Sequence, residues 1–204
     1  MSAKQPLYAI CLLTALTSWP AHLQATPSDR ENLLYSDACE SEIEESRQMN
    51  CLFEKQGIEG ILSAAEKAEE GGHPEIAFRL YVFASRKGSP AGSYNVGVFY
   101  ETGEVVDKNL ATAMDYYGKS AAAEFVPAYF NMGNLFCQAD FEANKNDCIY
   151  WLLRSFQAGD LDGGYNLAIF LIENDTDWAW AEVLLNMAAE QGHEPSAFLL
   201  EELK

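Results

Sequence analysis

The residues that most often carry enzyme chemistry are few in this sequence of 204 residues, and they stand apart from one another. Beyond the first 25 residues only two histidines remain, His73 in GGHPE and His193 in QGHEP, and both lie in turn sequences. Neither stands beside an obvious nucleophile that it would activate as a general base. The sequence also lacks the Gly-x-Ser-x-Gly, Ser-x-x-Lys, His-Glu-x-x-His and phosphate-loop motifs. We therefore expect no catalytic residues, and we interpret both histidines as turn or cap residues.

Acidic pairs and cysteines hint at metal sites, but neither pattern is complete. Asp160-Leu-Asp162 and Asp175-Thr-Asp177 do not continue into the spaced oxygen ligands and final glutamate of a calcium loop. The cysteines lack the close Cys-x-x-Cys pairs of a structural zinc site. We expect no metal ion and no cofactor, and the aspartates are interpreted as turn and cap residues.

Four cysteines lie beyond the N-terminal segment, namely Cys39, Cys51, Cys137 and Cys148. An even number of cysteines in an exported chain suggests disulfides. Three pairings are open, and sequence proximity favours Cys39–Cys51 and Cys137–Cys148. A disulfide needs Cα atoms within about 7 Å, whereas an unbroken helix would hold Cys39 and Cys51 roughly 18 Å apart. The first pairing therefore requires a turn between them, near Ser46–Asn50.

The first 25 residues have the layout of a secretory signal peptide. Lys4 precedes an apolar run from about Leu7 to Leu16, and a small residue, Ala25, follows. The apolar run is too short to span a bilayer as a mature helix. We expect cleavage after Ala25, a periplasmic or secreted product, and no stable membrane insertion after cleavage.

The charge of the chain limits the classes of partner. There are 31 acidic residues against 13 lysines and arginines, which gives a net charge of −18. Such a charge argues against binding to nucleic acid or to an anionic membrane surface. We expect a protein or peptide partner and no nucleic acid.

One eight-residue phrase occurs three times. It reads SYNVGVFY at 93–100, YFNMGNLF at 129–136 and GYNLAIFL at 164–171. An asparagine holds one position in all three copies, and an aromatic residue precedes it: Tyr94 and Asn95, Phe130 and Asn131, Tyr165 and Asn166. Two residues after each asparagine stands a small residue, where we expect two helix backbones to approach closely: Gly97, Gly133 and Ala168.

A second phrase, twelve residues long, occurs four times and starts at 77, 113, 148 and 181. A small residue opens each copy, a large apolar residue stands four positions on, and a small residue stands seven positions on. This spacing places all three on one face of an α-helix. Each repeating unit is therefore a helix, a loop, a second helix and a turn. Such a unit cannot bury its own apolar face and must stack on its neighbours as an α-solenoid.

The expected ends of the second helices carry cap and turn signals. Four residues before each twelve-residue phrase stands a candidate N-cap: His73, Asn109, Asn144 and Asp177. Three of the phrases end in glycine, which suits a turn of positive φ. The fourth ends in Glu124, where we expect strain. Prolines shortly afterwards stop the helices: Pro90, Pro127 and Pro195.

The segment GSYNVGVFYETGEVVDKNLATAMDYYGKSAAAEF resembles a repeat of the Sel-one-like repeat (SLR) family, a branch of the tetratricopeptide-like (TPR-like) solenoids. The small-x-Tyr-Asn-apolar-Gly start, the Gly103 and Val106 loop, the cap and the Ala-x-x-Tyr-Tyr helix carry the resemblance. It implies an all-α, right-handed solenoid of stacked antiparallel helix pairs, in an exported bacterial member of the family. The chain departs from the pattern at Ala168, where the family has glycine, and at Cys148, where it has alanine.

The resemblance and the repeats predict the organisation of the chain. A signal peptide covers 1–25, and an acidic helical capping segment covers 26–56, with a capping box at Ser28–Glu31 and a helix over Asp37–Glu45. A degenerate first repeat covers 57–90, and three full repeats cover 91–127, 128–162 and 163–195. Residues 196–204 form a C-terminal capping helix. The acidic segment has a second interpretation as a docking site.

The resemblance also implies a site. In related solenoids the first helices line a concave face, and asparagines near this position grip extended peptides. Carried over, this predicts a peptide groove of Tyr94, Asn95, Phe130, Asn131, Tyr165 and Asn166. The alternative is that these asparagines tie down neighbouring backbone and that the aromatic residues pack between helices. Of Trp178 and Trp180, we expect one to point into the core and the other to the surface.

The leading functional hypothesis is a non-catalytic protein–protein interaction module, an adaptor or regulator in the cell envelope. One alternative is an envelope hydrolase that acts on β-lactams or peptidoglycan fragments. Another is a structural component of an envelope machine.

Overall fold

The computed structural model describes residues 35–138 and 141–203, and the regular elements in these two ranges are all α-helices. In order they are α2 (Tyr35–Glu70), α3 (Pro74–Arg86), α4 (Pro90–Thr102), α5 (Leu110–Ala122), α6 (Val126–Gln138), α7 (Phe141–Gln157), α8 (Leu161–Glu173), α9 (Trp178–Glu190) and α10 (Glu194–Glu202). The predicted signal peptide and the Ser28–Glu31 capping box lie outside the described residues.

The chain divides into two compact units, Met1–Gln48 and Met49–Lys204. The described part of the first unit is the N-terminal part of α2, which includes Asp37–Glu45, the acidic stretch expected to be helical. A kink in α2 lies at Gly57, whose φ of 68° and ψ of −161° are not helical. Gly57 is also where the first repeat is expected to begin.

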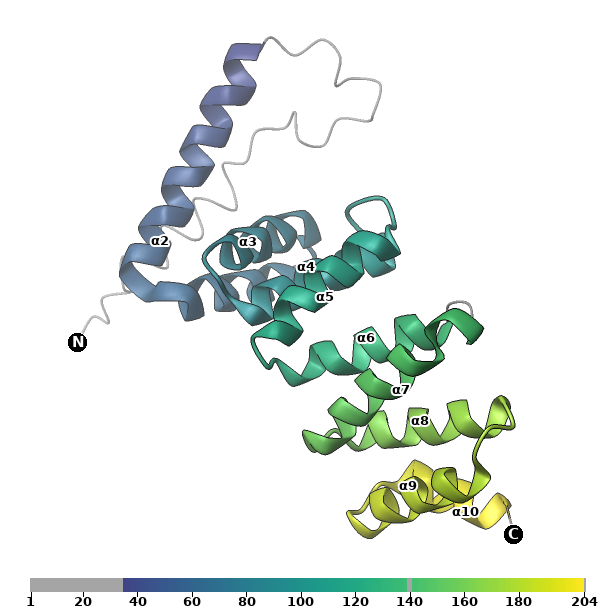
Figure 1. The fold of residues 1–204 in the computed structure, drawn as a ribbon. Coiled ribbons are helices and arrows are strands. Elements are labelled where there is room, and N and C mark those ends of the chain that lie inside the picture. Colours follow the sequence, from purple (N-terminus) through teal and green to yellow (C-terminus); the bar gives the residue numbers. More distant parts are fainter. Residues whose placement is uncertain (1–34, 139–140, 204) are drawn as a thin grey trace, which may run out of the picture. The chain divides into compact units, whose positions relative to one another are not determined.

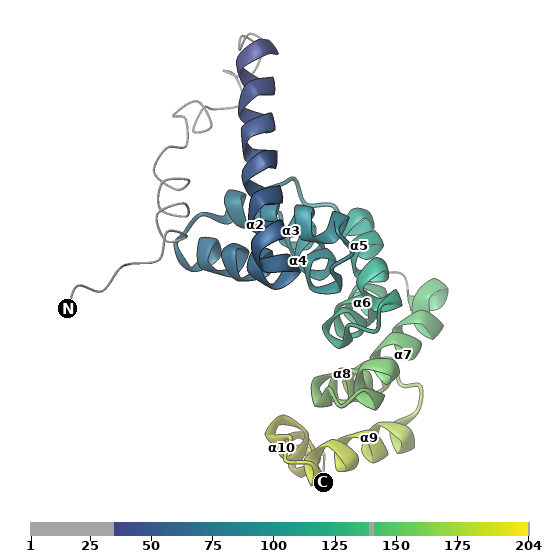
Figure 2. The same ribbon diagram turned by 90° about the vertical axis from the view of Figure 1, so that its left-hand side faces the viewer.

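Within the second unit, consecutive helices from α3 to α10 pack against one another in sequence order. Both views show α4, α6 and α8 alternating with α5, α7 and α9 (Figures 1 and 2). We call α4, α6, α8 and α10 the first helices, and α3, α5, α7 and α9 the second helices. This arrangement confirms the prediction of an all-α solenoid built from helix pairs.

The predicted face of the second helices forms the core between them and the first helices. All twelve side chains at the opening position, four positions on and seven positions on are at most 2% exposed: Ala77, Tyr81, Ala84, Ala113, Tyr117, Ser120, Cys148, Leu152, Ser155, Ala181, Leu185 and Ala188. The two buried serines are satisfied, because Ser120 Oγ donates to Pro90 O at 2.9 Å and Ser155 Oγ donates to Asp160 Oδ2 at 2.6 Å. The spacing therefore predicted the buried face correctly.

Glycine in the first helices makes room for this face. A Cβ on Gly97 would lie 2.6 Å from Tyr117 Cε1, and a Cβ on Gly133 would lie 2.6 Å from Leu152 Cδ2 and 3.0 Å from its backbone nitrogen. The third residue at this position, Ala168, is fully buried. The expected close approach of two helix backbones is present at Gly133, where Leu152 N lies nearby, whereas the space at Gly97 is taken by the side chain of Tyr117.

Two of the four predicted N-caps form cap hydrogen bonds. Asn109 Oδ1 accepts from Thr112 N at 3.1 Å, and Asp177 Oδ1 accepts from Trp180 N at 2.9 Å. His73 stands at the N-cap position of α3, but its side chain makes no cap bond. The prediction for Asn144 is wrong, because α7 already begins at Phe141. Residues that favour helix, such as Ala143 and Lys145, let α7 start about one turn early.

The turns that follow the second helices also agree with the sequence. Gly88, Gly159 and Gly192 have φ values of 87°, 94° and 91°. Glu124 takes the equivalent place with a φ of 60°, in a region that costs a side chain conformational energy. The strain expected at Glu124 is therefore present. Pro90, Pro127 and Pro195 stand in the first turn of α4, α6 and α10, where proline is tolerated because its missing N–H is not needed.

The prediction of a Cys39–Cys51 disulfide is wrong. Helix α2 runs through Ser46–Asn50 without the turn that this pairing requires. Cys51 has a free, exposed thiol. The Cys39 side chain lies outside the described side chains.

Among the described helices, none is both long enough and apolar enough to cross a membrane.

Candidate functional site

The six predicted groove residues lie on the first helices α4, α6 and α8, and all are partly buried. The structure brings Tyr94 and Phe130 together with the amide of Asn131. It places Tyr165 and Asn166 one repeat further along, in a separate set of contacts.

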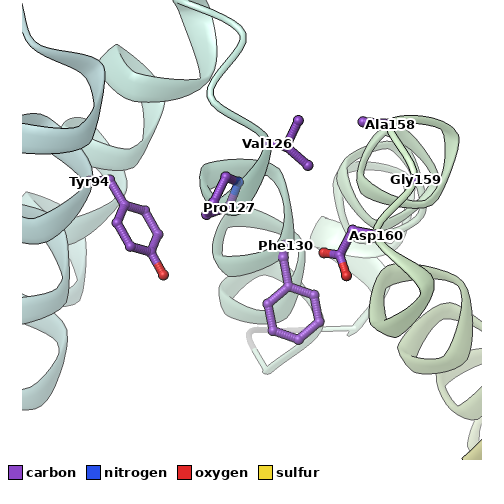
Figure 3. A pocket seen from close by; sticks show the side chains of 7 residues that line it. All are labelled: Tyr94, Val126, Pro127, Phe130, Ala158, Gly159 and Asp160. Carbon is purple, nitrogen blue, oxygen red and sulfur yellow. The ribbon is translucent and has the colours of Figure 1, made fainter.

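Tyr94 and Phe130 line a cavity of about 470 Å³, which we call the α4–α6 pocket. Its walls come from α4, from the first turn of α6 and from the turn between α7 and α8: Tyr94, Val126, Pro127, Phe130, Ala158, Gly159 and Asp160. Figure 3 shows Pro127 and Phe130 between the Tyr94 ring on one side and the Asp160 carboxylate on the other. The side chains that line the pocket are apolar except for the Tyr94 hydroxyl and this carboxylate.

Packing and hydrogen bonds fix the Tyr94 ring. Its centroid lies 5.6 Å from that of Tyr117 and 5.5 Å from that of Phe125. Asn131 Nδ2 donates to the Tyr117 hydroxyl at 2.9 Å and to the Tyr94 hydroxyl at 3.4 Å, so one amide ties α6 to both α4 and α5. The Tyr117 hydroxyl in turn donates to Glu101. Asn131 therefore positions a wall of the pocket.

These contacts change the acidity of the tyrosines. Burial raises the pKa of Tyr94, since the phenolate would lose its hydration. Burial also raises the pKa of Tyr117, and its hydrogen bond to the Glu101 carboxylate raises it further. Both hydroxyls therefore stay protonated at neutral pH and act as hydrogen-bond donors or acceptors.

Asp160 is the one charged residue among those that line the α4–α6 pocket. It stands at the N-cap position of α8, and its side chain makes no cap bond. Instead Asp160 Oδ2 accepts from the buried Ser155 Oγ at 2.6 Å, which anchors the carboxylate at the edge of the pocket. This bond leaves the other carboxylate oxygen, Oδ1, for a ligand.

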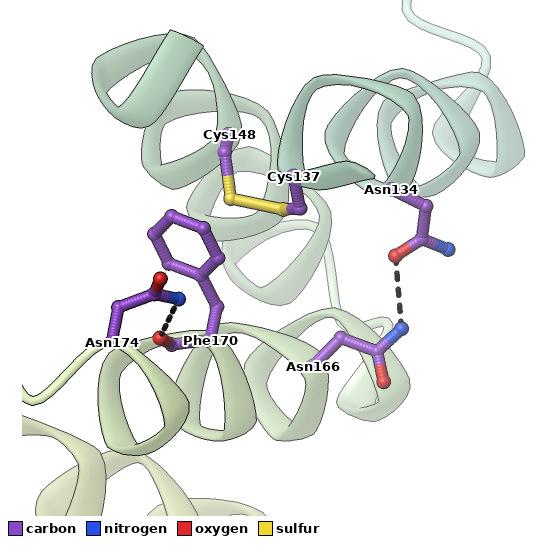
Figure 4. The surroundings of a disulfide bond; sticks show 6 residues. All are labelled: Asn134, Cys137, Cys148, Asn166, Phe170 and Asn174. Atoms are coloured by element: carbon purple, nitrogen blue, oxygen red, sulfur yellow. Dashed lines mark hydrogen bonds between the residues drawn. A yellow bond between two sulfur atoms is a disulfide. The ribbon is translucent and has the colours of Figure 1, made fainter. Parts of the chain in front are cut away.

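The other two asparagines have different partners. Asn95 Nδ2 donates to Ala91 O at 3.1 Å in its own helix. Asn166 Nδ2 donates to Asn134 Oδ1 at 2.9 Å and links α8 to α6 (Figure 4). In the described part of the chain, no donor bonds to the Oδ1 atom of any of the three groove asparagines. Their amide nitrogens thus serve the scaffold, while their carbonyl oxygens can accept from a ligand.

A disulfide joins Cys137 to Cys148, the second pairing that sequence proximity favours. It links the end of α6 to α7 with a Cα–Cα distance of 4.9 Å (Figure 4). Cys148 is fully buried at the position where the other second helices have alanine. The bond therefore crosslinks the two helices of one repeat from within its core.

His193 has a neighbour that sequence reasoning missed. Its Nδ1 accepts from Ser196 N at 3.3 Å and lies 2.7 Å from Ser196 Oγ, while its Nε2 lies 3.1 Å from Asp162 Oδ1. A serine, a histidine and an aspartate in this order resemble an acyl-transfer triad. Ser196 is 0% exposed, however, and offers no nucleophile to a substrate. The cluster caps α10 and ties it to α8, which is the cap role expected for His193.

The two tryptophans of α9 differ in burial, as expected. Trp178 is 48% exposed, and its Nε1 donates to Asp175 Oδ1 at 2.8 Å. Trp180 packs against the core that includes Leu167 and Leu185. Over the residues whose placement is described, no cluster of histidine, cysteine and acidic side chains has the geometry to hold a metal ion.

Several residues of the α4–α6 pocket were not predicted as site residues, namely Val126, Pro127, Ala158, Gly159 and Asp160. All five lie in or beside the turns between repeats. Asp160 was interpreted only as a turn or cap residue. The one available signal was its place directly after the Gly159 turn, next to the helix that carries Tyr165.

Comparison with known proteins agrees with this architecture. The sequence model of the Sel1 repeat family matches twice, at residues 90–125 and 126–160. The fold is similar to that of a Sel1 repeat protein from Oxalobacter formigenes, with a TM-score of 0.63 and 22% identity over 76% of this chain and 69% of that chain. It is also similar to c5321, a protective antigen of uropathogenic Escherichia coli strains that displays an SLR fold. That match has a TM-score of 0.67 and 23% identity, and it covers 76% of this chain and 35% of the antigen.

Both family matches coincide with helix pairs of the structure. The first covers α4 and α5, and the second covers α6 and α7. The same pairing of helices continues in α8 and α9. The repeated sequence, the helix pairs and the shared fold agree: this chain carries two Sel1 repeats at residues 90–160 and has the fold of Sel1-like repeat proteins.

Proposed function

We propose that this protein is a non-catalytic interaction module that binds a peptide or protein segment along its first helices, with the α4–α6 pocket as the main contact. Sel1 repeats generally serve protein–protein interaction. The observation that carries the proposal is that Tyr94 and Phe130, from consecutive repeats, form one apolar cavity with the carboxylate of Asp160 at its edge.

The pocket favours a particular kind of segment. Its apolar walls suit a hydrophobic side chain, whose burial supplies most of the affinity. Asp160 and the net charge of −18 favour a lysine or arginine beside that side chain. The Oδ1 atoms of Asn95, Asn131 and Asn166 can accept hydrogen bonds from peptide N–H groups. The partner is therefore an extended segment with an apolar anchor next to a basic residue.

We place this interaction in the cell envelope, in the periplasm or outside the cell. The Cys137–Cys148 disulfide supports this proposal, because such bonds persist in oxidising compartments. The signal-peptide layout of residues 1–25 supports it independently.

Selection from a random peptide library on the purified, oxidised protein tests the proposal. Enriched peptides should share an apolar residue flanked by lysine or arginine. Phe130→Ala should weaken their binding about tenfold or more, because it removes one wall of the pocket. Asp160→Asn keeps the shape of the side chain, and it should weaken only the peptides with a basic residue.

A matched control lies outside the pocket. Met187 is 46% exposed on α9, so Met187→Ala should leave peptide binding unchanged. Helicity and melting temperature are checked for each variant. The proposal fails if no peptides are enriched, or if a Phe130→Ala protein with native helicity binds them as tightly as the wild type.

A further inference from the structure

A second cavity, of about 300 Å³, lies against the second helices and shares no residue with the α4–α6 pocket. We call it the α5–α7 pocket. The end of α5, the turn after it, one residue of α6 and a face of α7 line it: Ala121, Ala122, Glu124, Tyr129, Tyr150, Trp151 and Arg154. None of these residues was predicted from the sequence to have a binding role.

Arg154 is held in place by aromatic residues. Its Nη2 donates to the Tyr129 hydroxyl at 3.0 Å, and its Nη1 lies 3.5 Å from the Tyr150 hydroxyl. The guanidinium carbon lies 4.9 Å from the centre of the Tyr129 ring. Tyr129 is only 3% exposed and stacks on Trp151 at 5.8 Å. Because Tyr129 is packed, its hydroxyl and ring orient the guanidinium before any ligand arrives.

The charge of Arg154 is not neutralised by a close ion pair. Among the residues that the structure describes, no carboxylate forms an ion pair with it. A guanidinium has five N–H donors in a planar fork that matches a carboxylate. The tyrosine hydroxyls engage only two of these donors. The remaining N–H groups are available to a ligand. Cationic side chains are scarce in this chain, which has 13 lysines and arginines against 31 acidic residues.

Trp151 also lines this pocket. Its indole N–H bonds to no described residue, although it stands beside the ring of Tyr129 and meets that of Tyr150 edge-on at 5.0 Å. Tyr150 itself is 49% exposed, so this wall of the pocket is open to a partner. A tryptophan with its face packed and its N–H unpaired is suited to hold a polar group next to an apolar one.

We propose that the α5–α7 pocket binds the C-terminal residue of a partner protein, with its carboxylate on Arg154 and its apolar side chain against Tyr150 and Trp151. The position of Arg154 beside Tyr150 and Trp151 favours this ligand, because a chain-terminal residue carries a carboxylate and an apolar side chain on one carbon atom. Aspartate and glutamate side chains have only methylene groups beside the carboxylate, without a large apolar substituent. The volume suits one terminal residue rather than a longer segment. This inference does not depend on the proposed role of the α4–α6 pocket.

Glu124 allows a specific test of the proposed carboxylate recognition. Its exposed carboxylate lines the same pocket and repels an anionic ligand. Glu124→Gln removes the charge and keeps the size of the side chain at this strained position. Binding of a carboxylate should therefore become about threefold tighter, whereas a ligand held only by apolar contacts would not respond.

The test is a titration followed by NMR through the indole N–H signal of Trp151, assigned with Trp151→Phe. Four probes are used: acetyl-Gly-Ala-Phe with a free C-terminus, the same peptide as its amide, N-acetylphenylalanine and benzoate. The free peptide should shift the Trp151 signal and bind at least as tightly as N-acetylphenylalanine. The amide should bind at least tenfold more weakly, because it lacks the charge that Arg154 recognises.

Three variants test whether the shift of the Trp151 signal arises from binding in the α5–α7 pocket. Arg154→Met should abolish the shift, and Arg154→Lys should give intermediate affinity, since it keeps the charge without the planar fork. Asp160→Asn, in the α4–α6 pocket, should leave the titration unchanged. Helicity is measured for each variant.

Any of three results would overturn the proposal. The first is equal binding of the peptide and its amide. The second is wild-type binding by an Arg154→Met protein with native helicity, together with no response to Glu124→Gln. The third is binding of benzoate but not of the free peptide, which would make the pocket a site for small acids.

Discussion

At the scale of single residues, the glycines two places after Asn95 and Asn131 show how the absence of a side chain shapes the fold. Gly97 and Gly133 leave room for Tyr117 and Leu152, the large residues of the following second helix. Another helical glycine, Gly118, has no atom within 4 Å of the place where a Cβ would stand. The two kinds of glycine therefore respond differently to the same substitution.

Gly97→Ala should lower the free energy of unfolding by about 1–3 kcal/mol, because the new methyl group would collide with the Tyr117 ring in a packed core. Gly118→Ala should raise it by about 0.5–1 kcal/mol, since alanine restricts the unfolded chain and favours helix. Urea unfolding of both variants measures the difference. A Gly97→Ala protein at least as stable as the wild type would contradict the packing described for this position.

Single residues also show where sequence reasoning stops. The three asparagines occupy one repeated position, yet Asn95 bonds within its own helix, Asn131 reaches two tyrosines and Asn166 reaches Asn134. The repeat predicted their place on the first helices. It could not predict their partners, because these stand on neighbouring helices whose residues differ between repeats. The contact of His193 with Asp162 was not predicted, because the two residues are 31 positions apart in the sequence.

At the scale of helices, local signals predicted most ends correctly. Asn109 and Asp177 cap as expected, and the turn after α5 carries the strain expected at Glu124. The errors have physical causes too. Helix α7 starts before Asn144 because its upstream residues favour helix, and α2 continues where a Cys39–Cys51 bond would need a turn.

Reduction of the Cys137–Cys148 bond should destabilise the pair α6 and α7. The bond closes a loop with a sequence separation of 11 residues, and loss of such a crosslink costs about 2–3 kcal/mol by the loop-entropy estimate. Thermal melting with and without reductant should therefore show a lower melting temperature in reductant.

Two control variants show whether the effect of reductant comes from this bond. A Cys137→Ala, Cys148→Ala protein should not respond to reductant, and Cys51→Ser should respond like the wild type. An identical melting curve in reductant, with the thiols shown to be free, would contradict the expectation.

At the scale of the whole stack, buried tyrosines link stability to pH. The Tyr81 hydroxyl donates to Glu69 Oε2 at 2.7 Å, and the Tyr117 hydroxyl donates to Glu101. Burial raises the pKa of both tyrosines, and the neighbouring carboxylates raise it further. The folded protein therefore holds these protons more tightly than the unfolded chain, in which tyrosine has a pKa of about 10.

The sign of the effect follows from this difference. The stabilisation is complete below about pH 10, and it is lost as the pH rises above that value, since the unfolded chain then releases protons that the folded protein retains. Urea unfolding between about pH 8 and pH 11 should show an almost constant free energy of unfolding at the lower values and a fall as the pH passes about 10. Tyr117→Phe should make that fall shallower. An equal slope in the variant and the wild type would show that Tyr117 does not contribute.

The stack also explains why the fold was easier to predict than the site. The spacing of small and large apolar residues in a helix pair is visible within a single repeat of the sequence. The solenoid could therefore be inferred from the repeats alone. The α4–α6 pocket combines α4, the start of α6 and the turn before α8, three segments that come together only when repeats stack. Tyr94 and Phe130 were predicted because they stand in the repeated phrase. Asp160 and Arg154 do not repeat, and their importance depends on their neighbours.

The main contacts of the second unit join helices that are consecutive in the chain, with α6 and α8 as an additional pair. A gene can therefore gain or lose a complete unit by duplication or deletion between two turns, and only one junction has to be remade. The number of repeats then becomes a trait that can change in a single genetic event. A surface can be lengthened in this way before its individual side chains have been refined for a partner.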